Sequence, residues 1–138
     1  MADPLSVAAS IIAVLQLTSK LISYLDDVKD APKDRDQWAI EASNLSSLLT
    51  QLRYRCTETS SNEPWYASVR ELGVHNGPLD QYKLALEDLQ AKVQKGKGLK
   101  DVLHSLQWKF VKKEVKETMM RIERLKTLVQ NALQLDHL

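Results

Sequence analysis

Hydrophobic positions recur every three or four residues along most of the chain, which is the period of an α-helix. The least polar stretch, "PLSVAASIIAVLQLTSKLISYL", runs from Pro4 to Leu25. Asp3 as N-cap and Pro4 as the first helical residue predict where its helix begins, and the acidic segment "DDVKDAPKDRD" ends it. Apart from Thr18 and Ser19, its polar side chains form one narrow stripe, so we expect neighbours on most other sides. The stripe comprises Ser6, Ser10, Gln16, Lys20, Ser23 and Asp27, with Ala13 filling the gap.

Four more segments carry helical spacing. A second helix is predicted from about Lys33 to Cys56, and a short one is entered at Pro64 and stopped by Gly73. Pro78 opens a helix to about Lys95, which "KGKG" ends. A periodic segment from Leu99 to Trp108 then leads into a last helix from about Lys112 to Leu135.

The apolar residues of these segments predict one shared core. No run of alternating β-branched residues or hairpin dipeptide indicates a strand. We therefore predict an all-α fold: a single-domain bundle over residues 1–138, with four to five main helices, a short connecting helix and a largely buried first helix. The expected inner positions are Leu45, Leu48, Leu49 and Leu52, then Leu79, Tyr82, Leu86, Leu89 and Val93, then Val115, Met119, Ile122, Leu125, Leu128, Val129 and Leu133, with Trp38, Trp65 and Trp108 as core aromatics.

The composition and the charge distribution narrow the range of possible functions. The net charge of +1 over 138 residues argues against a dedicated nucleic-acid binder. Charge is uneven, because residues 96–138 carry nine Lys/Arg against five Asp/Glu, whereas residues 1–31 carry two against four. Cys56 is the single cysteine, so an internal disulfide is excluded, and we expect a packed or half-exposed thiol there.

The sequence offers no pattern for catalysis. The three histidines are isolated from one another and from Cys56, so no metal-ligand spacing is present. Glu114, Glu117 and Glu123 share a helix with five Lys/Arg residues, and salt links along that helix explain them better than paired catalytic carboxylates. We therefore predict a non-enzymatic protein without a cofactor, a metal or a small-molecule substrate.

Three interpretations compete for the apolar first segment. A signal peptide requires positive charge before its apolar region, but here Asp3 precedes it and Asp26, Asp27 and Asp30 follow. A permanent membrane span is weakened by Lys20 and by the Ser, Thr and Gln residues. The pattern favours a central core helix, and a helix that is core in one state and inserted in lipid in another stays open. A cytoplasmic location is the default expectation.

A second notable stretch is "KGKGLKDVLHSLQWKFVKKEVK", where lysines alternate with Trp108 and Phe110. Lysines are attracted to anionic lipid, and Trp favours the headgroup level. The alternative is an ordinary solvated helix face with both aromatics packed inward, and a nucleic-acid patch is disfavoured because Arg is absent there. The candidate lipid contacts are Lys97, Lys100, Lys109, Lys112, Lys113 and Lys116.

Four stretches in order, "MADPLSVAASIIAVLQLTSKLI", "EASNLSSLLTQLRYR", "GPLDQYKLALEDL" and "IERLKTLVQNALQLD", give the chain a resemblance to a known family. The chain resembles the HeLo-like N-terminal domain of fungal STAND (NOD-like) receptors and ankyrin-repeat proteins. The resemblance implies a helical bundle followed in cis by nucleotide-binding or ankyrin-type domains. It also implies a role in fungal non-self recognition and regulated cell death, with self-association on activation.

The same resemblance implies that the first helix is membrane-active and relocates the protein to the plasma membrane. The alternative function is a protein–protein interaction module with no membrane step. "QWKF" corresponds to a Trp-Pro-Phe bend in the family, but Lys109 replaces the proline, so a bend and one longer helix both remain open around Trp108–Val111. The membrane-insertion candidates are Leu5, Val7, Ile11, Ile12, Val14 and Leu15.

Overall fold

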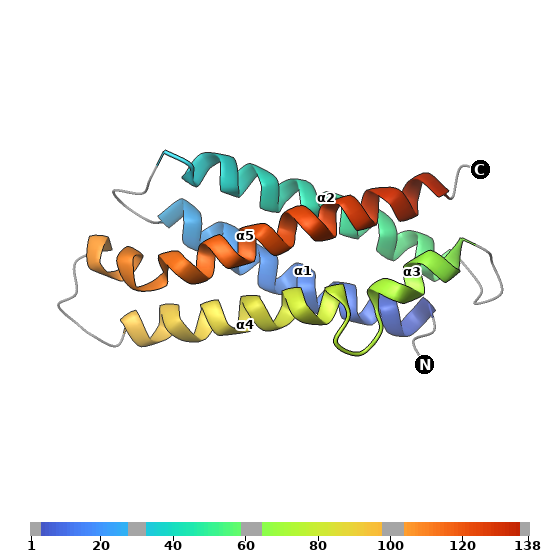
Figure 1. Ribbon diagram of the computed structural model, residues 1–138, viewed down its shortest axis with the longest axis horizontal. Coiled ribbons are helices and arrows are strands. Elements are labelled where there is room, and N and C mark those ends of the chain that lie inside the picture. The colour runs from blue at the N-terminus through green and yellow to red at the C-terminus, as the bar shows by residue number, and fades with distance from the viewer. Residues whose placement is uncertain (1–3, 28–32, 59–64, 98–103, 136–138) are drawn as a thin grey trace.

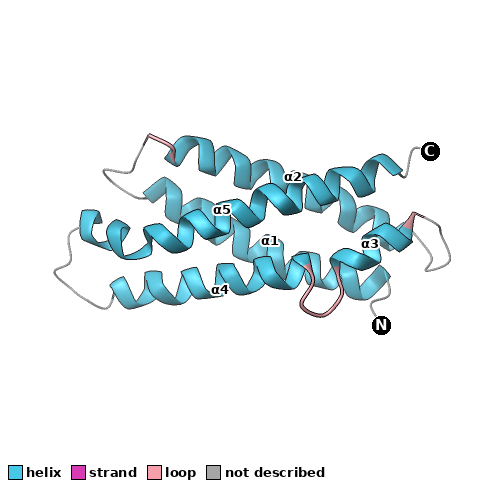
Figure 2. Ribbon diagram, viewed as in Figure 1, coloured by secondary structure: helices cyan, strands magenta, loops and turns pink. Residues whose placement is uncertain are grey.

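The structure is a computed structural model that describes residues 4–27, 33–58, 65–97 and 104–135, with side chains except at 95–97, 104–110 and 135. All regular structure in these residues is helical (Figure 2). The predicted all-α single-domain bundle is thus confirmed. The helices are α1 (Pro4–Asp27), α2 (Arg35–Glu58), α3 (Tyr66–Leu72), α4 (Pro78–Lys97) and α5 (His104–Leu135).

The four long helices run alternately in opposite directions along the bundle, with the short α3 between α2 and α4 (Figure 1). α1 packs against α2 and α4, and α5 packs against the same two helices from the other side. α1 and α5 therefore lie on opposite corners of the bundle. This arrangement leaves one outer face of α1 and one outer face of α5 open to solvent.

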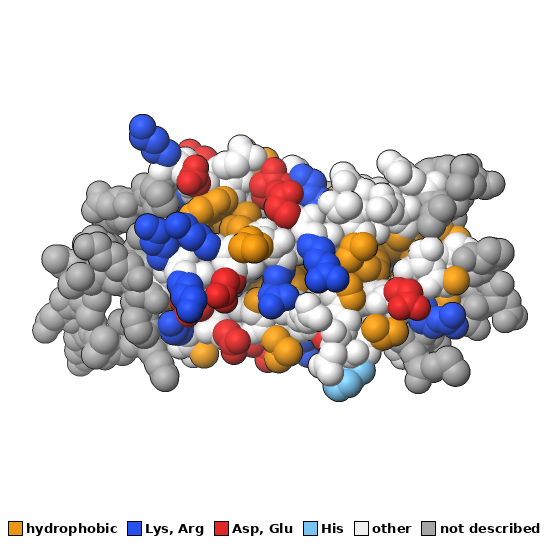
Figure 3. All heavy atoms as spheres, viewed as in Figure 1, with side chains coloured by type: hydrophobic (Ala, Val, Ile, Leu, Met, Phe, Trp, Pro, Cys, Tyr) orange, Lys and Arg blue, Asp and Glu red, His pale blue; other side chains and the backbone are white. Residues whose placement is uncertain are grey.

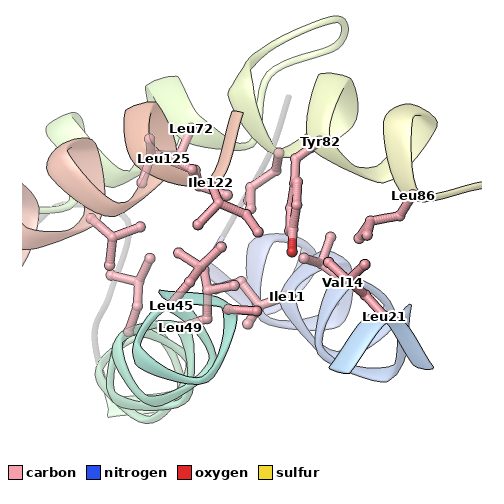
Figure 4. Packing of buried hydrophobic residues seen from close by; sticks show 14 of the residues in the cluster. Ile11, Val14, Leu21, Leu45, Leu49, Leu72, Tyr82, Leu86, Ile122 and Leu125 are labelled. Carbon is pink, nitrogen blue, oxygen red and sulfur yellow. The ribbon is translucent and has the colours of Figure 1, made fainter. Parts of the chain in front are cut away.

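The core is built from the inner stripes that the sequence predicts. Figure 4 shows Ile122 and Leu125 of α5 pointing toward Leu45 and Leu49 of α2, which are both fully buried. All five inner positions predicted on the fourth helix are buried. Leu48, Leu128 and Leu133 are partly buried at the margin of the core. Because each helix contributes one apolar stripe, no helix can leave without exposing the others.

The last helix is longer than its apolar pattern suggests. The structure joins residues 104–108 of the predicted Leu99–Trp108 segment to the predicted Lys112–Leu135 segment in the single helix α5 (His104–Leu135), and residues 99–103 lie outside the described part. The Trp108–Val111 segment is therefore part of one continuous helix. The physical reason is in the sequence, since residues 104–135 contain neither Pro nor Gly, and Lys109 keeps the backbone N–H that a proline lacks.

The predicted core aromatics have different surroundings. Trp65 is buried at the start of α3, with 8% of its surface exposed, whereas Trp38 is half-buried and packs against the edge of the core. The side chain of Trp108 and the predicted N-cap Asp3 lie outside the part that the structure describes. Cys56 is buried, and burial raises the pKa of its thiol to about 11. A buried neutral thiol reacts slowly with alkylating reagents.

Candidate functional site

α1 has two different faces rather than neighbours on most sides. Its buried residues recur along one face, while Leu5 is 69% exposed and Ile12 is 41% exposed on the other. The sequence prediction of a largely buried helix therefore holds for one face only. The outer face mixes these apolar side chains with most of the predicted polar stripe, including Gln16 and Lys20, which are exposed. The buried face consists of Pro4, Val7, Ala8, Ile11, Val14, Thr18, Leu21 and Leu25.

The length of α1 also suits a bilayer. Its 24 residues span about 36 Å at 1.5 Å per residue, which exceeds the roughly 30 Å of a bilayer hydrocarbon core. Among the described residues, α1 is the one helix long and apolar enough to cross a membrane, a property that core helices of soluble proteins share. The helix is thus a core element with the dimensions of a membrane span.

The six membrane-insertion candidates are divided between the two faces. Val7, Ile11 and Val14 are at most 1% exposed, so they can meet lipid only after α1 leaves the bundle. Leu15 is partly buried against the core. Leu5 and Ile12 are already accessible in the folded protein. Burying a side chain of this size is worth about 1.5–3 kcal/mol, so release of α1 is costly unless lipid replaces the lost protein contacts.

One buried polar contact fixes α1 to α4. The Thr18 hydroxyl lies 2.8 Å from the Val14 carbonyl oxygen and 2.7 Å from the Tyr82 hydroxyl. A carbonyl can only accept, so Thr18 donates its proton to Val14 and accepts a hydrogen bond from Tyr82. Figure 4 shows the Tyr82 oxygen directed at α1 beside Val14. Outside the bundle, Thr18 would keep its bond to Val14 and remain satisfied in lipid.

The second candidate surface, the α5 lysines, is only partly described. Lys112, Lys113 and Lys116 are exposed on α5, whereas Lys97, Lys100 and Lys109 have side chains outside the described set. Figure 3 shows basic side chains gathered over this face, with acidic ones interspersed. The described lysines are therefore free to meet an anionic surface, although the face as a whole is not uniformly positive.

Two ion pairs fasten α5 to its neighbours. Lys126 Nζ lies 2.8 Å from Glu41 Oε2 on α2, and Lys92 on α4 pairs with Glu114. The sequence interpretation of Glu114 as part of a salt link within its own helix is therefore wrong, since its partner is on α4. All four side chains are largely or partly shielded, with between 17% and 38% of each side chain exposed. Shielding makes such pairs stronger than fully exposed ones.

These pairs predict a loss of stability in acid. The hydrogen bond from Lys126 lowers the pKa of Glu41. Burial alone would raise the pKa of Glu114, but the hydrogen bond and charge of Lys92 bring that pKa below its usual value. A carboxyl with a depressed folded pKa stabilises the protein above its unfolded pKa, and this stability is lost as the pH falls through the folded pKa.

We therefore expect the unfolding free energy, measured by urea titration, to fall below about pH 4.5, the ordinary glutamate value. Glu41→Gln should lower stability at pH 7 by about 1.5–3 kcal/mol and make the acid loss shallower. Glu117→Gln, at an exposed position of α5, is the matched control. An unchanged acid profile in Glu41→Gln would contradict the assignment.

The contacts that position α1 and α5 were not evident from the sequence. Thr18 stood out only as a polar exception in an apolar helix, and its four-residue spacing from Val14 was the available signal.

His75 is 91% exposed in its side chain and lies 3.8 Å from a carboxylate oxygen of Asp80, which is a surface arrangement. Within the described residues, no group of three His, Cys, Asp or Glu could hold a metal ion.

No protein family, curated protein sequence or solved structure matches this chain.

Proposed function

We propose that this protein is a non-enzymatic effector domain of a larger cell-death receptor that acts on membranes through α1. In the folded protein α1 is docked between α2 and α4. Clustering of the attached receptor raises the local concentration of α1 and favours its transfer into the bilayer. The lysines of α5 supply the first contact with anionic lipid.

The observation that carries this proposal is the two-sided character of α1. The helix is long enough to span a membrane. Leu5 and Ile12 are exposed on its outer face, where no described element packs over them. Its outer face also carries Ala9 and Ser6, which are exposed small residues that allow helices to approach closely in lipid. The HeLo-like resemblance supports the same function and adds the cell-death context.

The alternative is a protein-interaction module that recruits a partner helix without a membrane step. The same exposed Leu5 and Ile12 favour it, because isolated apolar side chains on a helix surface also suit helix-on-helix contact. The two functions differ in one respect. Only the first requires the folded domain to bind lipid.

Vesicle sedimentation tests this difference. We expect the domain to sediment with anionic vesicles at low salt and to be released from them at high salt. It should not sediment with neutral vesicles. Each lysine near an anionic surface is worth about 1 kcal/mol. Replacing Lys112, Lys113 and Lys116 by Gln should therefore weaken binding on the order of a hundredfold, and all three are exposed, so folding should be unaffected.

A charge-matched control separates the effect of the three α5 lysines on vesicle binding from the effect of the protein's net charge. Lys33, Arg70 and Lys83 are also exposed, but they lie apart on three other segments. Their replacement by Gln removes the same charge and should reduce vesicle binding by far less. Equal loss in both triple variants, or no sedimentation of the unmodified domain at low salt, would favour the interaction module.

A further inference from the structure

The first turn of α1 and the last turn of α5 lie at the same end of the bundle, and α3 is beside both (Figure 1). α3 contacts α1, α4 and α5, although it is only seven residues long. α1 and α5 are on opposite corners and share little direct contact. Besides α2 and α4, which pack against both helices, the short α3 therefore links these two ends directly.

The beginning of α3 holds the end of α5. The indole Nε1–H of Trp65 donates to the carbonyl oxygen of Ala132 at 2.6 Å, and Trp65 is 8% exposed. α5 ends at Leu135, so Ala132 carries one of the last four carbonyls, which have no partner within the helix. Trp65 thus caps the last turn of α5 from outside.

The end of α3 holds the beginning of α1. A Cβ atom at Gly73 would lie 2.8 Å from Cγ2 of Val7, closer than side chains approach one another. Gly73 has φ −97°, which any residue can adopt, so the requirement for glycine comes from this contact and not from the backbone. Val7 is 1% exposed, and its β-branched side chain has little freedom to move.

We propose that residues Trp65–Gly73, here called the strap, couple the last turn of α5 to the first turn of α1. Displacing the end of α5 from Trp65 shifts α3 and loosens its contact with Val7. In this way a force on the C-terminal end of the bundle would favour release of α1. This regulatory use rests on the proposed function, whereas the coupling itself is a property of the free domain and needs no membrane.

Amide hydrogen exchange in the free domain tests the coupling. Trp65→Phe removes the indole donor, and we expect exchange at least tenfold faster both in residues 128–135 of α5 and in residues 8–14 of α1. The centre of α2, around Leu49, serves as the reference for global unfolding and should change far less. Trp38→Phe makes the same chemical change outside the strap and should not affect both ends together.

Gly73→Ala tests the coupling in the other direction. The added methyl group should speed exchange at the end of α5 as well as in α1, because coupling between two sites is reciprocal. Adding Val7→Ala removes the atom that the methyl group meets, and should restore slow exchange at the end of α5. An effect confined to the mutated end, or an equal rise throughout the bundle, would overturn the proposal whatever the vesicle experiments show.

Discussion

Ile12→Glu should abolish leakage of anionic vesicles by the artificially clustered domain while leaving the bundle folded. Ile12 is 41% exposed on α1, so its replacement leaves the buried face intact, and stability should change by no more than about 0.5 kcal/mol. In the bilayer the effect is different. A carboxylate near the middle of a membrane helix costs roughly 3 kcal/mol, and every chain of a cluster would carry that cost.

The matched control is Leu84→Glu. Leu84 is 55% exposed on α4, so the substitution introduces the same charge in place of an exposed apolar residue, but outside the proposed inserting helix. We expect leakage to continue in this variant. Deletion of α1 would be a poorer test, because its eight buried residues form part of the core. Leakage by Ile12→Glu equal to that of the unmodified domain would exclude insertion of α1.

Thr18→Val should destabilise the protein more than Tyr82→Phe, although each removes one hydroxyl from the same hydrogen bond. Both residues are fully buried. In Thr18→Val the Tyr82 hydroxyl loses its acceptor and stays buried without one, which costs about 1–3 kcal/mol. In Tyr82→Phe the Thr18 hydroxyl keeps the Val14 carbonyl as acceptor, so only the net value of one hydrogen bond is lost, about 0.5–1.5 kcal/mol.

The double variant gives the sharper result. With both hydroxyls gone no buried donor is left without an acceptor, so Thr18→Val with Tyr82→Phe should be more stable than Thr18→Val alone. Urea denaturation of the three variants measures this. If Tyr82→Phe costs as much as Thr18→Val, or if the two losses simply add, then Tyr82 is not the donor and the polar contact between α1 and α4 has been misassigned.

Helical periodicity was sufficient to predict the long helices and the inner faces of α2, α4 and α5, but not that of α1. Pro78 begins α4 as expected, and Leu79, Tyr82 and Leu86 are buried there. The reason is that burial of one stripe per helix is a local property of the sequence. The exact ends were less predictable, because helix ends depend on weak, competing caps: α2 runs from Arg35 to Glu58, whereas the sequence predicted about Lys33 to Cys56.

What periodicity could not predict are contacts between residues far apart in the chain. The hydrogen bonds from Tyr82 to Thr18 and from Trp65 to Ala132 join positions more than sixty residues apart. Nor does the apolar pattern of α1 distinguish Ile11, which is buried, from Ile12, which is exposed. That distinction depends on which neighbours pack around the helix, and it is the one that defines the candidate site.

The most direct measurement follows α1 itself into the membrane. Gln16→Cys places a thiol on the exposed face of α1, where an environment-sensitive fluorophore can be attached while buried Cys56 reacts slowly. On clustering with anionic vesicles, we predict that the emission shifts to the blue and is quenched by lipids labelled deep in their acyl chains. Emission that stays water-like, with the protein fully sedimented on the vesicles, would contradict insertion of α1.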